Sequence, residues 1–294
     1  MAMPQFQVHQ PKTLESVLDL LGRHRSSVKL LCGGTDLLIK MRAGAQAPEH
    51  LVSLNRVAGL KTISYAGGDG LVIGGAARIS QVGKNAEVRR LYPGLAHACS
   101  VMATVQIRNM GTVAGNLVNA APSADTAAPL LAYGASVVAV ERGGRRQIKL
   151  VDFFTGPGLT VLEPGEMVEA IRVPDVSPRS GSCYLRLSAR SKVDIAAVSV
   201  AGFLNLDLEG RVIRCRLALG SVGPTPLRCP EAEQILEGQT PDEKLIAQAA
   251  AACVRASRPI DDLRATAAYR RAMVQVLAQR VLTQSLDMAK GGTP

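Results

Sequence analysis

The sequence predicts an α+β protein in two parts: a mixed α/β region up to about residue 177, then a domain with a three-stranded antiparallel sheet and helices. Three observations support this division. Amphipathic helices and short apolar strands alternate from the N-terminus. The linker Pro174–Gly181, rich in proline and serine, then interrupts the alternation. Beyond it, strand-like runs come first and helical runs come last. The predicted units are a first domain at 1–177, with lobes at about 1–57 and 58–177, and a second domain at 178–294.

The N-terminal elements follow from periodicity and cap residues. Leu14, Val17, Leu18 and Leu21 have the spacing of one helix face, and Thr13 is a good N-cap. Three short apolar runs predict strands at 28–32, 51–54 and 70–75, the last followed by a helix that opens near 78–81. The lobe therefore begins with a helix and continues with strands.

The middle and C-terminal elements are predicted in the same way. The apolar run 101–107 is interpreted as a strand that ends before a segment of small residues. Strands at 136–141 and 146–150 flank a Gly143-Gly144 turn, and a strand at 167–173 ends at Pro174. The C-terminal sheet is predicted at 182–189, 196–208 and 212–221. Two later helices are predicted, one with Thr240 as N-cap, Pro241 at N1 and Glu243 at N3, the other from Asp261 to about Leu286.

The composition excludes several classes of function. The chain has 294 residues and 47% hydrophobic residues, which indicates a globular protein with a large core. Aromatic residues make up only 3% and Trp is absent, which disfavours binding of single-stranded nucleic acid by stacking. The net charge of +10 is scattered, and its densest group, Arg142, Arg145 and Arg146, is interpreted as a solvated hairpin tip. We expect no nucleic-acid partner.

Cysteines and histidines show no metal-ligand spacing. The six cysteines are far apart and form no C-x-x-C pair, and His9, His24, His50 and His97 are isolated along the chain. We therefore expect no metal site in this chain. The N-terminus lacks a signal-peptide pattern, and no apolar run approaches the ~20 residues of a membrane span. Reduced cysteines and a cytoplasmic location are the corresponding expectations.

The first candidate binding segment is a glycine turn between a strand and a helix. Leu31 and Cys32 end the strand, and Gly33-Gly34-Thr35-Asp36 follow before the apolar run that starts at Leu37. A turn of this kind presents bare N–H groups to a phosphate. The alternative is a plain β-to-α turn capped by Thr35 or Asp36. Neither a G-x-G-x-x-G motif after a strand nor a P-loop is present.

The second candidate segment runs from Thr112 to Asp125, about eighty residues further on. Thr112, Gly115, Asn116, Ser123 and Asp125 combine hydroxyl, bare backbone, amide and carboxylate groups, and we expect neither helix interior nor strand core here. The alternative is a structured loop held by Asx-turns. Two such segments in one chain indicate one extended nucleotide bridging two subdomains.

Three motifs carry a resemblance to a known family. They are Gly33-Gly34-Thr35-Asp36-Leu37-Leu38, the stretch from Ile107 to Asn116, and Pro122-Ser123-Ala124-Asp125. The chain resembles, over essentially its whole length, the FAD-binding medium subunit of the molybdenum hydroxylases, the carbon monoxide dehydrogenase and xanthine dehydrogenase family. Ala114 departs from the glycine usual there. The implied fold is a two-lobed FAD-binding domain of the vanillyl-alcohol-oxidase and molybdenum-flavoprotein type (PCMH-like), followed by a C-terminal flavoprotein domain.

The resemblance implies a set of FAD-binding residues and no catalytic side chain. Asp125 is expected to bind a hydroxyl of the flavin nucleotide, Val168 to contribute backbone, and Arg186 to place a cation near the flavin. Because neither motif holds a histidine, non-covalent FAD is expected. Arg190 and Asp194 match a family signature but are more simply a structural ion pair. The expected cofactor-binding residues are Leu31, Cys32, Gly33, Gly34, Thr35, Asp36, Thr112, Gly115, Asn116, Ser123, Asp125, Val168 and Arg186.

The implied function is electron transfer within a larger complex. Such a subunit passes electrons from two-iron–two-sulfur clusters of a small partner subunit to NAD+ or a quinone. Substrate chemistry takes place at a molybdopterin cofactor on a large partner subunit, in a heterotrimer that commonly dimerises. The sequence lacks the Cys-rich insert of the 4-hydroxybenzoyl-CoA reductase branch. Two alternatives stay open: a stand-alone FAD-dependent oxidase of the vanillyl-alcohol type, and a basic binding module without enzymatic activity.

Overall fold

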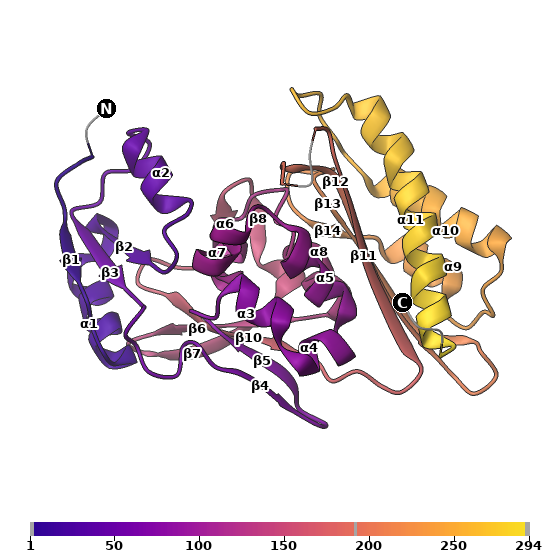
Figure 1. The fold of residues 1–294 in the computed structure, drawn as a ribbon, viewed down its shortest axis with the longest axis horizontal. Helices are drawn as coiled ribbons and strands as arrows, with labels where there is room; N and C mark the ends of the chain where they lie inside the picture. The colour runs from indigo at the N-terminus through magenta and orange to yellow at the C-terminus, as the bar shows by residue number, and fades with distance from the viewer. Residues whose placement is uncertain (1–2, 191–192, 292–294) are drawn as a thin grey trace.

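The computed structural model describes residues 3–190 and 193–291, which form a row of three sheet-based units (Figure 1). A three-stranded sheet lies at the N-terminal end, a five-stranded sheet in the middle and a four-stranded sheet at the C-terminal end. Helices pack against each sheet, so the predicted mixed architecture is confirmed. Within the described residues, none of the helices has both the length and the apolar content that crossing a bilayer requires.

The N-terminal lobe is a parallel sheet in the order β1-β3-β2, packed against one helix. Thr13 caps that helix as predicted, since its hydroxyl accepts a hydrogen bond from the Ser16 N–H at 3.2 Å. Val17 and Leu21 on the helix are buried in one cluster with Val52 of the sheet. The elements are β1 (Gln7–His9), α1 (Leu14–His24), the 3-10 turn η1 (Arg25–Ser27), β2 (Val28–Leu31) and β3 (His50–Ser53).

The glycine turn after β2 leads into α2 (Leu37–Arg42), a helix of six residues. The helix starts with the apolar run at Leu37, and Asp36, not Thr35, occupies the N-cap position. In the described part of the chain, the Asp36 side chain makes no capping hydrogen bond. Its carboxylate accepts instead from Asn119 Nδ2 at 3.2 Å, far along the sequence. The turn is therefore held by a tertiary contact.

The central lobe is an antiparallel sheet in the order β4-β5-β10-β6-β7. The predicted hairpin around Gly143 is confirmed, and the Arg145 and Arg146 side chains at its exposed edge pair with Glu169 and Glu166. The strands are β4 (Ile63–Ala66), β5 (Gly70–Gly74), β6 (Ser136–Glu141), β7 (Gly144–Lys149) and β10 (Met167–Val173). The 3-10 turn η2 (Leu150–Asp152) and the two-stranded sheet of β8 (Phe154–Gly156) and β9 (Leu159–Thr160) lie between β7 and β10.

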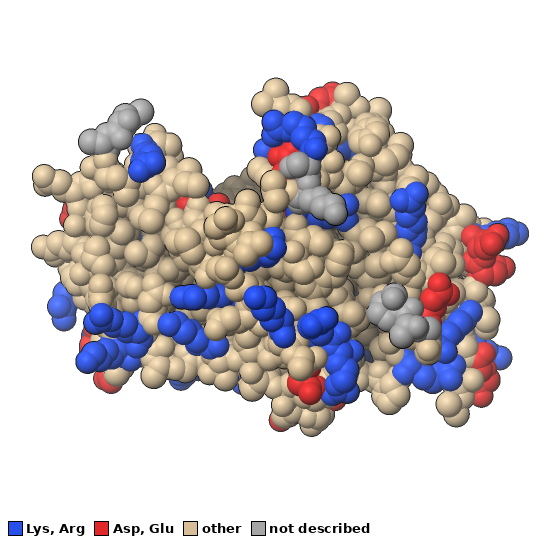
Figure 2. Space-filling view, viewed as in Figure 1, with Lys and Arg blue, Asp and Glu red and all other residues tan. Residues whose placement is uncertain are grey.

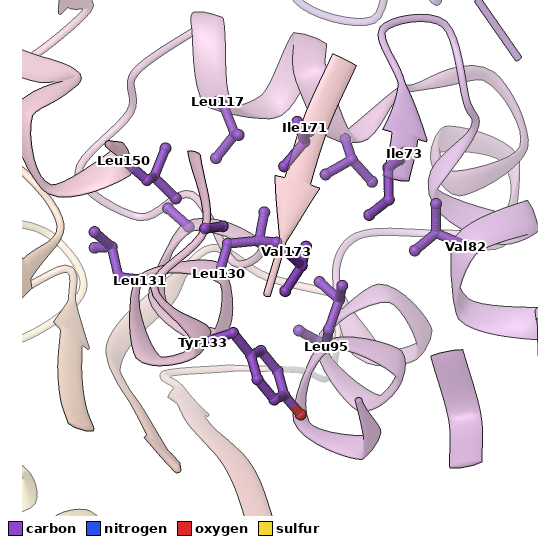
Figure 3. Packing of buried hydrophobic residues seen from close by; sticks show 14 of the residues in the cluster. Ile73, Val82, Leu95, Leu117, Leu130, Leu131, Tyr133, Leu150, Ile171 and Val173 are labelled. Carbon is purple, nitrogen blue, oxygen red and sulfur yellow. The ribbon is translucent and has the colours of Figure 1, made fainter. Parts of the chain in front are cut away.

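Six short helices cover one face of the central sheet, and the core lies between the two layers. Figure 3 shows Leu130 of α8 packing toward Val173 of β10, while Leu131 lies on the side of Leu150. Tyr133, at the end of α8, lies in the same buried cluster. The helices are α3 (Ile79–Lys84), α4 (Ala86–Leu91), α5 (Pro93–Val101), α6 (Val105–Met110), α7 (Val113–Val118) and α8 (Ala127–Tyr133).

The second candidate segment differs from the prediction, because part of it is helical. The expected strand before it is replaced by α6, and residues 113–118 form α7. Two threonines explain the outcome: Thr104 accepts from the Ile107 N–H and Thr112 accepts from the Gly115 N–H, so each starts a helix. Burial of Val113 on α7 adds the packing that a helix containing glycine needs.

The C-terminal domain is an antiparallel sheet in the order β11-β12-β13-β14. The three predicted strands are present, and a two-residue strand, β14, extends the sheet. All eleven residues of β12 are buried, because the strand separates two cores. Val200 and Leu204 belong to the cluster shared with the C-terminal helices, whereas Ala201 and Phe203 belong to the central-lobe cluster. The strands are β11 (Ser180–Ser188), β12 (Ala196–Leu206), β13 (Val212–Gly220) and β14 (Leu227–Arg228).

Three helices, α9 (Pro230–Leu236), α10 (Glu243–Ala256) and α11 (Ala267–Ala289), complete the C-terminal domain. Both predicted starts were too early. The α10 helix is capped by Asp242, whose carboxylate accepts from the Leu245 N–H at 2.7 Å, and α11 is capped by Thr266. In each case a later cap residue, closer to the apolar run, starts the helix.

Candidate functional site

A cavity of about 330 Å³ lies where the two candidate segments meet, a size typical of ligand sites. Figure 2 shows the molecule hollowed along its upper edge, between the lobe that carries α2 and the C-terminal domain. Nine of the thirteen predicted binding residues line this cavity. They are Cys32, Gly33, Gly34, Thr35, Asp36, Thr112, Gly115, Asn116 and Val168.

The two segments touch through backbone at Gly33. A Cβ atom at this position would lie 2.2 Å from Met110 O and 2.8 Å from Gly111 Cα, both backbone atoms. The neighbouring Gly34 has φ +70°, a conformation that residues with a side chain rarely adopt. Only glycine at both positions lets the turn close against the end of α6. The wall of the cavity is therefore backbone on both sides at this point.

Side chains of α2 and α7 form a second link across the cavity. Lys40 Nζ donates to Asn119 Oδ1 at 2.7 Å, and Asn119 Nδ2 donates to the Asp36 carboxylate at 3.2 Å. The described lining residues include two cations, Lys29 and Lys40, and one anion, Asp36, which gives a net charge of 2 − 1 = +1. Sequence reasoning missed Lys29, Lys40 and Asn119. The signal for Lys40 was its position one helical turn after Asp36.

Thr112 and Asn116 are engaged within the protein. Thr112 Oγ1 accepts from the Gly115 N–H at 3.0 Å, so this hydroxyl caps α7. Asn116 Oδ1 accepts from Thr126 Oγ1 at 2.6 Å, which fixes the orientation of the carboxamide. Burial raises the pKa of the Cys32 thiol to about 11, although Thr112 opposes the rise. Cys32 is therefore a neutral thiol at neutral pH and not a nucleophile.

One buried polar atom in the cavity lacks a partner. Among the described residues, Gln46 Oε1 is shielded and has no hydrogen-bond donor, although Gln46 lines the cavity. A buried acceptor without a donor lowers the stability of the fold, unless a ligand supplies the donor. Glycine backbone, excess positive charge and an unfilled acceptor suit the pyrophosphate and hydroxyl groups of a dinucleotide such as FAD. Sequence reasoning missed Gln46, which follows α2 in an unpatterned loop.

Four predicted residues are not among the described residues that line the cavity: Leu31, Ser123, Asp125 and Arg186. The Leu31 side chain lies beneath the turn, with Cδ1 3.0 Å from the position of a Cβ on Gly34. Asp125 accepts hydrogen bonds from Tyr184 at 2.5 Å and from Arg186 at 3.4 Å, which joins α8 to β11. Their roles toward a cofactor stay predictions.

Electrostatics at Asp125 are those of a buried pair. Burial raises the pKa of the Asp125 carboxyl, and Arg186 and Tyr184 oppose this shift. Arg186 also donates to the Asp194 carbonyl oxygen, while its Nε is buried and has no partner among the described residues. Arg190 and Asp194 form an ion pair at 3.0 Å, with the arginine exposed, as the simpler interpretation predicted.

A second group of potential ligands lies outside the cavity, in the N-terminal lobe. His9, His24 and His50 are isolated in the sequence, but the structure places one nitrogen of each within 4.8 Å of the others. The spacing rule missed this group because the three residues come from β1, α1 and β3, which meet only through tertiary packing.

Comparison with known proteins identifies the family of the chain. Residues 4–176 match the family described as FAD binding domain in molybdopterin dehydrogenase, and residues 183–285 match the CO dehydrogenase flavoprotein C-terminal domain. The xanthine dehydrogenase FAD-binding subunit of Escherichia coli O157:H7 is 32% identical, with 96% of this chain and 97% of that protein covered. The carbon monoxide dehydrogenase medium chain of Hydrogenophaga pseudoflava is 33% identical, covering 96% and 97%.

Solved structures show the same fold over nearly the whole chain. The carbon monoxide dehydrogenase of Hydrogenophaga pseudoflava that lacks the Mo-pyranopterin moiety superposes with a TM-score of 0.92 at 34% identity, covering 97% of this chain and 98% of that one. Quinoline 2-oxidoreductase from Pseudomonas putida 86 gives 0.90 at 27% identity, covering 98% and 99%. The chain therefore belongs to the FAD-binding subunits of the molybdenum hydroxylases, the carbon monoxide and xanthine dehydrogenase family, and is an oxidoreductase subunit.

Proposed function

We propose that this chain holds FAD non-covalently in the cavity and transfers electrons from iron–sulfur clusters of a partner subunit to an external acceptor, NAD+ or a quinone. The observation that carries the proposal is the closure of one cavity by both motif segments, with Gly33 packed on Met110. When bound, FAD supplies the exchange of one or two electrons. The protein holds and orients the cofactor and excludes water.

The pyrophosphate is assigned to the turn between β2 and α2. The backbone of Cys32–Asp36 offers N–H groups there, and Lys29 and Lys40 supply positive charge on the same wall. Asn119 holds both Lys40 and the Asp36 carboxylate, which reduces the repulsion that this carboxylate exerts on a phosphate. Thr112, Gly115 and Asn116 form the opposite wall, with their conformation set by the α7 cap.

The remaining parts of the cofactor are assigned by chemistry. Gln46 Oε1 accepts a hydrogen bond from a hydroxyl or amino group of the nucleotide, which removes the unpaired acceptor. Val168 also lines the cavity, with its carbonyl oxygen facing Gly75. The flavin ring is assigned to the side facing the C-terminal domain, where the Asp125–Arg186 pair fixes β11 against the central lobe and Ser123 lies two residues before Asp125. We place the boundary between the two domains at residues 177 and 178, in the segment that joins β10 to β11.

The proposed assembly has two other kinds of subunit. One is large and carries the molybdopterin cofactor, and the other is small and carries two-iron–two-sulfur clusters, in a heterotrimer that dimerises. The names of the relatives support this, since they are described as a medium chain or an FAD-binding subunit. The Cys32 thiol in the cavity wall stays protonated at neutral pH, so it does not act as a nucleophile there.

Cofactor content is tested by the visible absorption spectrum of the purified chain. We expect flavin bands, and about one FAD released per chain on mild denaturation. A colourless protein that takes up no added FAD would refute the assignment of the cavity. FAD that stays attached after denaturation would contradict the non-covalent site and favour the stand-alone oxidase.

Electron transfer is tested separately from binding. The flavin of the purified chain is reduced by light in the absence of oxygen, with EDTA as the electron donor, and is then mixed with NAD+, a quinone or molecular oxygen. Rapid reoxidation by NAD+ or the quinone, but slow reoxidation by oxygen, is expected. Rapid reaction with oxygen alone would place the protein with the oxidases and leave the FAD site standing.

A further inference from the structure

Three of the four histidines of the chain meet on the N-terminal lobe. His9 Nε2 lies 3.1 Å from His50 Nδ1, and the His24 and His50 ring centroids are 3.7 Å apart. The third pair, His9 and His24, is stacked with centroids 5.6 Å apart. All three side chains are partly exposed, so the group is open to ions from solvent.

Regular secondary structure brings the three rings together. Gln7 of β1 pairs with His50 of β3, and His9 pairs with Val52, so His9 and His50 point to the same face of the parallel sheet. Helix α1 packs on that face through Val17 and Leu21. His24 follows Leu21 by three residues, so it lies on the same side of the helix. The group is thus built into the lobe.

The ring nitrogens of this group are suited to a metal ion. A metal ion binds imidazole through a ring nitrogen that carries no proton, and histidine is the commonest metal ligand in proteins. The structure places one ring nitrogen of each of the three histidines within 4.8 Å of the others. Zn–N bonds of about 2.0–2.1 Å in a tetrahedral site place two nitrogens about 3.3 Å apart, close to the 3.1 Å between His9 and His50.

We propose that His9, His24 and His50 form a binding site for one divalent transition-metal ion, with Zn²⁺ the best match and water as the fourth ligand. In the described structure none of the three histidines lines the cavity assigned to FAD, so the site is separate from the proposed function. A bound ion would tie the N-terminal strand β1 and the end of α1 to the central strand β3. With three protein ligands and one position open to solvent, the site has the ligand number of an open zinc site and not that of a closed, four-ligand structural site.

The proposal is tested on the FAD-loaded chain prepared without a polyhistidine tag and stripped of metal by a chelator. Zn²⁺ binding is measured by equilibrium dialysis for the unaltered chain and for His9→Gln, His24→Gln and His50→Gln. The matched control is His97→Gln, which removes the one histidine outside the group. Flavin content and circular dichroism establish that each variant is folded.

We expect about one Zn²⁺ per chain, with affinity at least tenfold weaker in each of the three variants and unchanged in His97→Gln. No binding by the unaltered chain at about 100 µM free Zn²⁺ would overturn the proposal. Binding that persists in all three variants would do the same. X-ray absorption of the zinc-loaded, unaltered chain needs no variant: a nitrogen shell at about 2.0 Å supports the site, and a sulfur shell at about 2.3 Å refutes it.

Discussion

The cavity region and the C-terminal domain are built in opposite ways. Around the cavity, α2, α6 and α7 are each six residues long, and turns that contain glycine and threonine precede α2 and α7. The C-terminal domain contains an eleven-residue strand that is buried throughout and a 23-residue helix. The cavity region consists mainly of the ends of short helices and strands. The C-terminal domain consists mainly of the interiors of long ones.

This difference separates binding from stability. A six-residue helix leaves most of its N–H and C=O groups without internal partners, so these groups are available to caps or to a ligand. The cavity region therefore depends on close backbone approach and on single polar contacts. The C-terminal domain depends on its packed core and on the buried Arg270, which is 3% exposed. Substitutions around the cavity should therefore change FAD affinity, and substitutions in the C-terminal domain should change the free energy of unfolding.

The largest expected effect is on the stability of the C-terminal domain. Arg270 donates to the Ala197 and Ser221 carbonyl oxygens and to Asp262, so Arg270→Met removes these three contacts and takes this donor from two buried carbonyl oxygens. We expect a loss of about 3–5 kcal/mol in the free energy of unfolding, measured by denaturant titration. The exposed neighbour Arg271 is the control, and Arg271→Met should leave stability nearly unchanged. An equal loss in both variants would show that the buried contacts do not decide stability.

The second expected effect is on cofactor binding. Gly33→Ala places a Cβ 2.2 Å from Met110 O, so the two motif segments must separate. We expect FAD affinity to fall at least tenfold, about 1.4 kcal/mol, by titration of the apoprotein. Gly22→Ala is the matched control, since a Cβ there has no neighbour within 4 Å. Full FAD affinity in Gly33→Ala would mean that the close contact at Gly33 is not needed.

A third substitution, at Thr112, should change both stability and FAD binding. Thr112→Val removes the cap of α7, which should cost about 1 kcal/mol of stability and also weaken FAD binding. Thr13→Val removes the corresponding cap of α1, outside the cavity, and should lower stability alone. Thermal unfolding and FAD titration of both variants test this. If Thr112→Val binds FAD normally, α7 does not shape the cofactor site.

The smallest expected effect is a pH dependence in the C-terminal domain. Burial would raise the pKa of Asp262, but hydrogen bonds from the Arg264 N–H, the Arg270 side chain and the Ala265 N–H lower it to about 2. A depressed carboxyl pKa contributes stability above the unfolded value of 3.8, and this contribution is lost as the pH falls toward 2. The difference in stability between the unaltered chain and Asp262→Asn should therefore shrink between pH 5 and about pH 2.5. A constant difference would mean that Asp262 does not titrate with folding.

Much of the fold was predictable because its signals are local. Helix periodicity with a threonine cap defined α1, and the Gly143-Gly144 turn after an apolar run defined the hairpin of β6 and β7. Errors arose where two polar residues competed for one cap, as Thr240 and Asp242 did before α10. They also arose where burial made a helix of a segment with weak helical propensity, as in α7.

The composition, the element order and the chemistry of both motif segments can be read from the chain, because each depends on neighbouring residues. Three features cannot be read in this way. They are the close contact at Gly33, the two lysines and the glutamine that line the cavity, and the meeting of His9, His24 and His50. Periodicity shows which face of an element is apolar, but not which distant segment covers that face. Packing decides that choice, and the contacts between distant residues follow from it.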